Sequence, residues 1–518
     1  MDSATSPVAV APTALQHETT SQHIRGSSVL LVGRVLSLAV NFAVQVMTVR
    51  YLSKSDYGAF AYALSIVNMG AALAMFGFGK SITRFVPIYQ EQRDYGRMFG
   101  AILLMFSTTL LLGLAVVLAF YGFQGLMARS FSIDPEAIRL LLILILLSPV
   151  QGLDNLLGGM LAIFASPRAI FFRKHLLGPG LKMIIVLLLI VGQGNVYSLA
   201  IGYVAGSIFA VVAYAAIVIH VMGRQGLLRR FATHILQMPA REVFSFTMPL
   251  LASEMVVAAR SSLMVVLLEY FRSTVDVAAF RAAVPVAGLN MVVLETFTFL
   301  FMPMASRLFA RNDREGINDL YWQTAIWMTI IAFPIFVVTF SLAQPLTLIL
   351  YEQRYADSAI ILTLLSLGYY LNTALGFNSL TLRVYGKVRY LLIVDLISAA
   401  ASVGLSLVLI PRYGALGAAI GFCATMLVQN IFYQVGLKLS AGIEAFRWRY
   451  LKVYLTITLG IVGLWLIQTT LGPAIYVSFA LAALTSLLVI LLNRGALKIG
   501  QTFPELRRLP LGQRLFGE

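Results

Sequence analysis

The chain carries little charge and only one cysteine. Asp, Glu, Lys and Arg together make up 12% of its 518 residues, whereas a soluble domain carries about 25%. This scarcity excludes a water-soluble enzyme, a nucleic-acid-binding domain and a disordered chain. The single cysteine, Cys423, permits no internal disulfide, and its apolar neighbours predict a buried, inert thiol.

Apolar residues are abundant instead, at 59% of the chain with a mean hydropathy of +0.86. Each of 14 apolar spans is long enough to cross about 30 Å of hydrocarbon as a helix. These spans predict an all-α polytopic membrane protein with about 14 transmembrane helices. Pro334 and Pro345 lie in one long span, which we expect to be kinked or broken. The spans are 28–49, 57–79, 98–120, 138–164, 175–192, 196–222, 243–268, 277–303, 320–350, 358–382, 388–410, 413–437, 450–471 and 474–493.

Basic residues are distributed unequally between alternate loops. Of the 38 Lys and Arg residues, 27 fall on the side of the two tails and 7 on the other side. Because cytoplasmic loops collect Lys and Arg, we expect both termini to lie in the cytoplasm. The net charge of +16 therefore reflects membrane topology and predicts no nucleic-acid partner.

An internal repeat connects the two halves of the chain. Asp56 returns as Asp276 at an offset of 220, and Gly202 returns as Gly421 at an offset of 219. The repeat predicts two six-helix lobes in the same orientation, followed by a helix pair. The predicted parts are a disordered cytoplasmic tail (1–27), an N-terminal lobe (28–222), a cytoplasmic linker (223–242), a C-terminal lobe (243–439), an additional helix pair (440–493) and a basic cytoplasmic tail (494–518).

Eight ionisable residues lie inside the predicted spans, where a side chain that faces lipid is costly. In the first span Arg34, Asn41 and Gln45 share one helical face. Such stripes predict a hydrated cavity, with Asn41 and Gln45 among its lining residues. The basic members are Arg34, Lys182, Arg260 and Arg281, and the acidic members are Asp154, Glu254, Glu295 and Asp395.

These charges admit two interpretations. The eight residues can form internal ion pairs that fix helix packing, since the two signs are equal in number. Alternatively, Arg34 and Arg260, which have no evident partner on their own helices, serve a substrate. Arginine suits a diphosphate because it donates two parallel hydrogen bonds. The four acidic residues are candidates for carrying H⁺ or Na⁺.

Motifs for other chemistry fail. Residues Gly79, Lys80 and Ser81 end like a phosphate-binding loop, but Ala74 replaces its leading glycine and an apolar helix precedes it. The five histidines show no metal-ligand spacing, and no nucleophile motif is present. We therefore expect no cofactor, no metal and no enzymatic activity. The pair Gly202 and Gly206 is typical of close helix packing.

Several segments resemble the lipid-linked oligosaccharide flippases of bacterial polysaccharide biosynthesis. That family belongs to a superfamily with the multidrug and toxin extrusion antiporters and the peptidoglycan-precursor flippase. The similarity covers about residues 25–490. It is carried by 50–60 (RYLSKSDYGAF), 77–79 (GFG), 84–87 (RFVP), 201–203 (IGY) and 411–421 (PRYGALGAAIG).

The resemblance implies a two-lobed inner-membrane transporter that works by alternating access. Its substrate would be a polyprenyl-diphosphate-linked oligosaccharide, moved from the cytoplasmic to the periplasmic leaflet for O-antigen, capsule or exopolysaccharide synthesis. It further implies that Arg34, Arg260 and Arg281 lie in a central cavity near the diphosphate. Coupling to H⁺ or Na⁺, contact with membrane lipids, and partnership with polymerase or assembly proteins are also implied.

Two other functions compete with this interpretation. An ion-coupled multidrug or cation antiporter has the same fold, but a cationic drug needs acidic residues without competing arginines. A membrane-embedded polysaccharide polymerase or ligase needs a sizeable external loop, and the longest here is about residues 121–137. A scaffold within an assembly complex would have no evident use for charges inside its spans.

Overall fold

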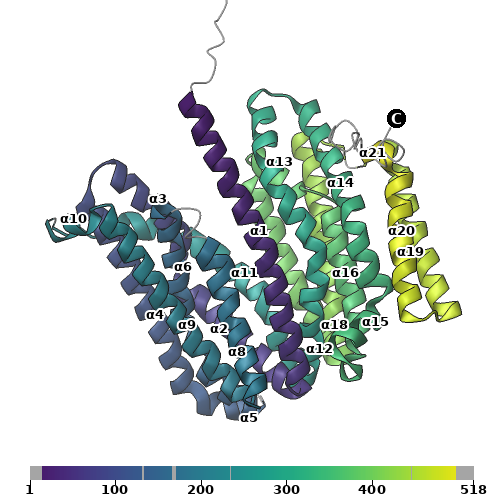
Figure 1. Ribbon diagram of the computed structural model, residues 1–518, viewed down its shortest axis with the longest axis horizontal. Coiled ribbons are helices and arrows are strands. Elements are labelled where there is room, and N and C mark those ends of the chain that lie inside the picture. The colour runs from purple at the N-terminus through teal and green to yellow at the C-terminus, as the bar shows by residue number, and fades with distance from the viewer. Residues whose placement is uncertain (1–13, 131–133, 166–170, 234, 445, 498–518) are drawn as a thin grey trace, which may run out of the picture. The chain divides into compact units, whose positions relative to one another are not determined.

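The computed structural model consists of helices joined by short connections (Figure 1). It describes residues 14–130, 134–165, 171–233, 235–444 and 446–497. Within those ranges the side chains of 14–32, 126–130, 232–233, 253, 257, 260, 261 and 299 lie outside the description. Every regular element of the described residues is helical, which confirms the predicted all-α class.

The chain divides into two compact units. Unit 1 comprises Met1–Tyr51, Ile66–Gly125 and Arg139–Met255, and unit 2 comprises Leu52–Ser65, Leu126–Ile138 and Val256–Glu518. Helices α2 (Lys54–Met75) and α11 (Ala240–Phe271) are divided between the units. All or most of the following elements belong to unit 1: α1 (Ala14–Tyr51), α3 (Phe78–Glu91), α4 (Tyr95–Ser130), α5 (Pro135–Leu144), α6 (Leu147–Phe164), η1 (Phe172–Leu177), α8 (Gly178–Val191), α9 (Val196–Arg224) and α10 (Leu227–Thr233).

Unit 2 holds the remaining elements. These are α12 (Thr274–Gly288), η2 (Leu289–Met291), α13 (Val292–Ala310), α14 (Arg314–Ser341), α15 (Ala343–Tyr351), η3 (Gln353–Tyr355), α16 (Ser358–Ala374), α17 (Asn378–Val384), α18 (Val388–Ala441), η4 (Trp448–Tyr450), α19 (Leu451–Leu471), α20 (Ile475–Leu492) and α21 (Arg494–Leu497). The break between α14 and α15 at Leu342 confirms that the long proline-containing span is interrupted.

Eleven helices of the described residues are long and apolar enough to cross a membrane. One of them, α18, has 54 residues and would extend about 80 Å if straight, far more than a bilayer core. It contains a sharp kink at Gly414, which has φ +57°. Gly421 lies against Leu405 and Ser406, so the chain doubles back there and α18 covers two predicted spans. Helices α1 and α11 are not among the eleven, and the number 14 stays a prediction.

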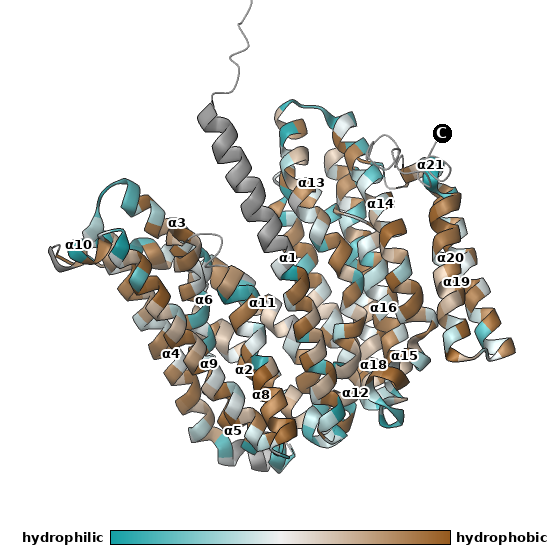
Figure 2. Cartoon of the chain, viewed as in Figure 1, coloured by the Kyte–Doolittle hydropathy of each residue, from teal (hydrophilic) through white to brown (hydrophobic). Residues whose placement is uncertain are grey.

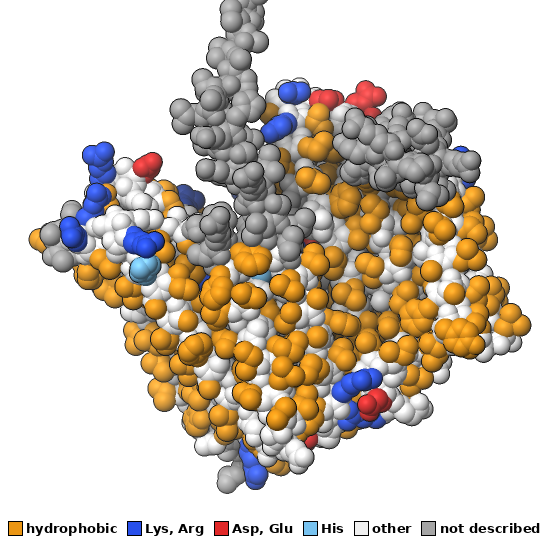
Figure 3. All heavy atoms as spheres, in the orientation of Figure 1, with side chains coloured by type: hydrophobic (Ala, Val, Ile, Leu, Met, Phe, Trp, Pro, Cys, Tyr) orange, Lys and Arg blue, Asp and Glu red, His pale blue; other side chains and the backbone are white. Residues whose placement is uncertain are grey.

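Aromatic and aliphatic side chains fill the interior of each unit. In unit 1 the core joins α3, α4, α6 and α9 around residues such as Phe78, Met98 and Leu156, all fully buried. In unit 2 Phe336 and Tyr370 stack at 3.9 Å between ring centroids in the core of α14 and α16. Figure 2 shows that α4, α19 and α20 are mostly hydrophobic, and in Figure 3 hydrophobic side chains cover the middle of the visible helices. This is the surface that a lipid environment requires.

Small residues allow close helix packing in unit 1. A side chain added at Gly202 or Gly206 would come within 2.7 Å of Ile185, so α8 packs directly against these glycines of α9. The predicted packing role of this pair is confirmed. Without a hydrophobic driving force between helices in lipid, such close contact is a main source of association. Cys423 is buried in α18, as predicted.

The predicted part boundaries stay predictions. The predicted tail of residues 1–27 overlaps α1, which begins at Ala14, and residues 1–13 lie outside the described chain. In the predicted tail of residues 494–518, α21 ends at Leu497 and the rest is likewise not described. Helices α2 and α12 begin at Lys54 and Thr274, which lie 220 residues apart, the offset of the repeat.

Candidate functional site

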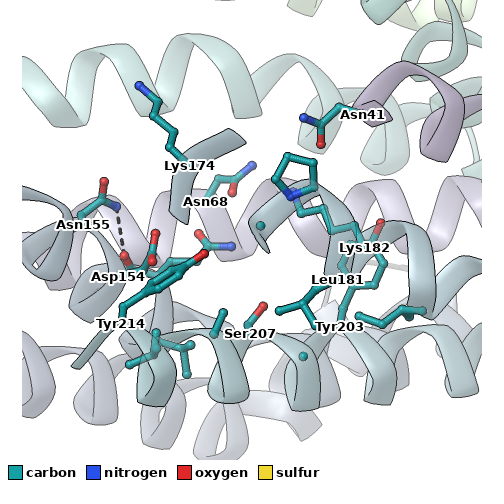
Figure 4. Close-up of a pocket in the computed structure, with 18 residues that line it drawn as sticks. Asn41, Asn68, Asp154, Asn155, Lys174, Leu181, Lys182, Tyr203, Ser207 and Tyr214 are labelled. Carbon is teal, nitrogen blue, oxygen red and sulfur yellow. Dashed lines mark hydrogen bonds between the residues drawn. The ribbon is translucent and has the colours of Figure 1, made fainter. Parts of the chain in front are cut away.

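A polar cavity of about 460 Å³ lies within unit 1. It is formed by α1, α2, α6, η1, α8 and α9 (Figure 4). Apolar side chains such as Leu181 and Ile185 line part of it. Polar groups inside apolar helices are costly in lipid, so their concentration here indicates a site that admits water or a polar ligand. Its polar lining residues are Asn41, Asn68, Gln151, Asp154, Asn155, Lys174, Lys182, Tyr203, Ser207 and Tyr214.

Helix α6 supplies three adjacent polar residues. Gln151, Asp154 and Asn155 follow a spacing of three and four, which places them on one helical face. Asn155 Nδ2 donates to the backbone oxygen of Gln151 at 2.9 Å, and its side chain is exposed in the cavity (Figure 4). Amide groups donate and accept hydrogen bonds, so this face can bind hydroxyl groups of a ligand.

The cavity carboxylate is already paired. Arg173 Nη2 lies 2.7 Å from Asp154 Oδ1 and also donates to the backbone oxygen of Asp154 at 2.6 Å. The Arg173 side chain is only 13% exposed, and its guanidinium lies 4.5 Å from the ring centroid of Tyr214. In Figure 4 the Tyr214 ring lies beside Asp154. The pair leaves the cavity with little net negative charge from Asp154.

A π-helical turn positions these groups. In η1 the backbone N–H of Gly178 donates to the carbonyl of Arg173, five residues earlier, which widens the turn. Arg173 thereby reaches α6 and α9, whereas Lys174 lines the cavity. His175 Nδ1 lies 3.0 Å from Ser37 Oγ on α1. Pro179 follows directly and lacks the N–H that a regular turn would use, which favours the wide turn.

Two lysines give the cavity a positive charge. The side chains of Lys174 and Lys182 are exposed and contribute to the lining. Within the described residues neither takes part in an ion pair. With Asp154 held by Arg173, the cavity presents two ammonium groups among amides and hydroxyls. This combination suits a ligand that carries phosphate together with hydroxyl groups.

Of the three cavity residues predicted on α1, only one lines the unit 1 cavity. Asn41 lines the cavity and donates to the backbone oxygen of Ser37 at 2.7 Å. Arg34 and Gln45 are half-buried on the same helix and are not lining residues of this cavity. Arg34 lies two turns before Asn41, and its carbonyl accepts the Ser37 hydroxyl at 3.0 Å.

The predicted arginines of the second half lie in unit 2. Arg281 Nη2 donates to Ser65 Oγ at 2.5 Å. The side chain of Arg260 lies outside the described part of the chain. Arg34 and Arg281 therefore belong to different compact units. The substrate roles of all three arginines stay predictions.

The acidic residues have varied partners. Glu254 Oε1 accepts from Lys80 Nζ at 2.8 Å within unit 1. In unit 2, Asp395 Oδ1 accepts from Gln429 Nε2 at 2.7 Å and from the Tyr433 hydroxyl. Glu295 is exposed. Their proposed function in ion coupling stays a prediction. No group of three His, Cys, Asp or Glu side chains that suits a metal occurs among the residues described.

Sequence reasoning missed several cavity residues. Arg173 and Lys174 precede the predicted span 175–192, so the sequence does not predict that they lie at a cavity. The helical segment in fact begins at Phe172. Gln151 and Asn155 carried a usable signal, since they share the helical face of Asp154, the same spacing that identified the stripe on the first span.

Comparison with known proteins decides the family. A family model described as polysaccharide biosynthesis protein matches residues 47–360. The chain belongs to this family. It is 28% identical over 348 residues to the succinoglycan biosynthesis transport protein ExoT of Rhizobium meliloti (strain 1021), covering 64% of each chain. The match therefore spans just under two thirds of the length of that relative.

A second relative is an uncharacterized membrane protein, MJ1068, of Methanocaldococcus jannaschii. The identity is 22% over 418 residues, with 77% of this chain and 80% of the relative covered.

Two solved structures show the same fold. The lipid II flippase MurJ, in an inward closed conformation, has a TM-score of 0.67 at 16% identity, covering 91% of this chain and 99% of MurJ. An inward-facing multidrug resistance MATE family transporter of the MOP superfamily has a TM-score of 0.65 at 16% identity, covering 79% and 94%. This member of the polysaccharide biosynthesis protein family is thus a multi-pass membrane protein with the fold of these transporters and flippases.

Proposed function

We propose that the chain is a flippase for a polyprenyl-diphosphate-linked oligosaccharide. It would move this substrate from the cytoplasmic to the periplasmic leaflet of the inner membrane, by alternating access, for synthesis of O-antigen, capsule or exopolysaccharide. Both termini would lie in the cytoplasm, as the distribution of Lys and Arg indicates. No covalent step is required, because translocation changes only the position of the substrate.

The observation that carries the proposal is the charge of the unit 1 cavity. Lys174 and Lys182 line it, while its carboxylate Asp154 is paired with Arg173 at 2.7 Å. Ammonium groups bind the oxygens of a diphosphate, and the amides of α6 and α1 bind sugar hydroxyls. An apolar prenyl chain stays in lipid at no cost, so the cavity needs to receive only the polar part.

Further residues complete the proposal. Arg34, Arg260 and Arg281 would contact the diphosphate at other stages of transport, since guanidinium groups bind it through two parallel hydrogen bonds. A coupling ion, H⁺ or Na⁺, would bind at acidic residues. The candidates are Asp154, Glu254, Glu295 and Asp395, of which Asp154 and Glu254 pair with Arg173 and Lys80. A polysaccharide polymerase would receive the product.

A multidrug or cation antiporter is the second candidate, and Asp154 favours it. Its side chain lines the cavity and is 40% exposed, so a cationic drug could compete for it. Such a drug would have to displace Arg173 and tolerate both lysines nearby. The two functions therefore make opposite demands on the cavity charge.

The test is to delete the gene and locate the lipid-linked glycan in the two leaflets. We expect the glycan to accumulate on the cytoplasmic leaflet and surface polysaccharide to be lost, with both restored by the wild-type gene. The variant Arg34→Ala/Arg260→Ala/Arg281→Ala should fail to restore them. Lys387→Gln/Arg389→Gln, which removes two exposed charges of unit 2 far along the chain from any cavity residue, is the matched control and should restore both.

Other outcomes would reject the proposal. A normal leaflet distribution in the deletion strain, together with new sensitivity to cationic compounds, would identify an antiporter. A lipid-linked product with newly formed glycosidic bonds, made by the purified chain, would identify a polymerase or ligase.

A further inference from the structure

A second cavity, of about 500 Å³, lies in unit 2 at one end of α14, α19 and α20. We name it the α19 cavity. It is separate in the chain from the unit 1 cavity and has a different composition. Its charged lining residues are the four cations Arg447, Arg449, Lys452 and Arg494, and the carboxylate Asp319.

One of these cations is structural. Arg447 Nη1 lies 2.5 Å from Asp319 Oδ1 on α14, and Arg447 Nε lies 2.5 Å from Glu444 Oε2. The side chain is only 19% exposed. The pair with Asp319 attaches the segment before α19 to α14, and with both carboxylates bound Arg447 shapes the wall of the cavity and is already neutralised.

The charge that remains available is positive. Arg449 and Lys452 are exposed, and neither takes part in an ion pair or a side-chain hydrogen bond recorded for the residues described. Even when Glu444 is counted, the cations of the α19 cavity outnumber the carboxylates by four to two.

The remaining wall of the cavity combines two amide side chains with apolar residues of α19 and α20, and its apolar part continues onto exposed apolar surface. Leu492 lines the cavity and is 47% exposed. Beyond it α19 and α20 expose leucines, such as Leu459 at 70% and Leu484 at 56%, and both helices are mostly hydrophobic in Figure 2. Trp448, 77% exposed, lies beside the cavity in sequence, where an aromatic ring is typical of the membrane–water boundary.

We propose that the α19 cavity binds the headgroup of an anionic membrane phospholipid. The phosphate contacts Arg449 and Lys452, while the acyl chains lie along α19 and α20. A soluble anion would use the cations but not the apolar wall, whereas a phospholipid uses both. The charge distribution predicts that this end is cytoplasmic, where anionic lipids attract basic residues close to the membrane.

The experiment measures lipid binding to the purified full-length chain by native mass spectrometry, with phosphatidylglycerol and phosphatidylcholine of the same acyl chains. We expect one preferential site for phosphatidylglycerol. Arg449→Gln/Lys452→Gln should weaken that site about 25-fold, since each cation near an anionic lipid contributes a factor of about five. Arg449→Lys/Lys452→Arg keeps both charges and should retain binding. Lys387→Gln/Arg389→Gln, again the matched control, should bind as the wild type does.

Three results would overturn the proposal. Equal weakening in the control would mean that phosphatidylglycerol responds only to total charge. Displacement of phosphatidylglycerol by millimolar glycerol 1-phosphate would identify a site for free anions. Tighter binding of farnesyl diphosphate than of phosphatidylglycerol, lost in the same variant, would identify a prenyl diphosphate site. Because each readout is binding, the result does not depend on whether the chain is a flippase.

Discussion

Several polar residues of unit 1 line a cavity, whereas a group of asparagines in unit 2 hydrogen-bond to one another. In unit 1 the side chains of Asn155, Lys174 and Lys182 are exposed in the cavity. In unit 2 Asn378 Nδ2 donates to Asn430 Oδ1 at 2.9 Å, and Asn430 Nδ2 donates to an asparagine of α16 at 2.9 Å. The same kind of side chain thus lines a cavity in one unit and joins helices in the other.

The asparagine network of unit 2 connects three helices. Asn372 lies on α16, Asn378 on α17 and Asn430 on α18. Asn378 and Asn430 are at most 3% exposed, so water does not compete for their hydrogen bonds. Nearby the buried Tyr321 hydroxyl lies 2.7 Å from Gln434 Oε1. The polar stripe of the first span predicts a hydrated interior, whereas the asparagines of unit 2 form a closed network.

The largest effect is expected from breaking the unit 2 network. Asn430→Leu keeps the number of side-chain heavy atoms but removes the Asn430 partner of Asn372 Oδ1 and of Asn378 Nδ2. We expect the free energy of unfolding to fall by about 3 kcal/mol, because each buried unpaired polar group costs about 1–3 kcal/mol. Denaturant titration of the purified chain in detergent measures this change. The matched variant is Asn155→Leu in the cavity, with an expected change within about 0.5 kcal/mol.

If the two asparagine variants destabilised the chain equally, the contrast between the units would be wrong.

The next effect concerns transport instead of stability. Lys174→Gln/Lys182→Gln removes both cavity ammonium groups, and we expect the flipping rate of a polyprenyl-diphosphate glycan in vesicles to fall at least about tenfold. One lost hydrogen bond to a charged group accounts for a change of that size. The free energy of unfolding should stay unchanged, since neither lysine has an ion-pair partner among the residues described. An unchanged flipping rate would mean that the substrate does not pass through the unit 1 cavity.

A smaller effect is expected from the ion pair that borders the cavity. A double-mutant cycle with Asp154→Asn and Arg173→Gln should give a coupling of about 1 kcal/mol in unfolding, the upper range for partly exposed pairs. Arg173→Gln alone should also raise the affinity of the chain for cationic compounds, because it frees the Asp154 carboxylate. A coupling near zero would show that Asp154 is available in the wild type.

The smallest effect is expected outside both regions. Lys54 Nζ lies 2.6 Å from Asp357 Oδ2 in unit 2, where the Asp357 side chain is 57% exposed. We expect Lys54→Gln/Asp357→Asn to cost about 0.5 kcal/mol in the free energy of unfolding, because water and salt screen exposed pairs. The difference from the wild type should vanish at high salt. A larger loss of unfolding free energy that does not depend on salt would mean that this pair behaves like the buried hydrogen bonds of unit 2.

The starts of α2 and α12 show which features can be predicted from local sequence. Ser53 and Ser273 each precede a helix, and their hydroxyls accept the backbone N–H of Asp56 at 3.0 Å and of Asp276 at 3.4 Å. A serine at this position caps a helix through contacts within four residues, so the repeat could be recognised from sequence. The carboxylate of Asp276 also accepts a hydrogen bond from the backbone N–H of Ala415 at 3.1 Å. No local sequence pattern indicates this contact.

The ion pairs of unit 1 show what local sequence cannot predict. Asp154 was identified as an ionisable residue inside a span, and an internal ion pair was one of its two interpretations. Its partner Arg173 precedes the predicted span 175–192, and the π-turn that carries it toward α6 has no periodic signature. Likewise Glu254 pairs with Lys80, which the sequence assigned to a loop at the membrane surface.

The sequence by itself determined the class of the molecule. Long apolar spans leave the backbone no alternative to helices in lipid, and the two repeats and the basic loops predict their order and orientation. Only the tertiary structure decided which polar side chains line a cavity and which form hydrogen bonds with one another. That choice depends on partners such as Asn372 and Asn430, 58 residues apart, which meet only when the helices pack.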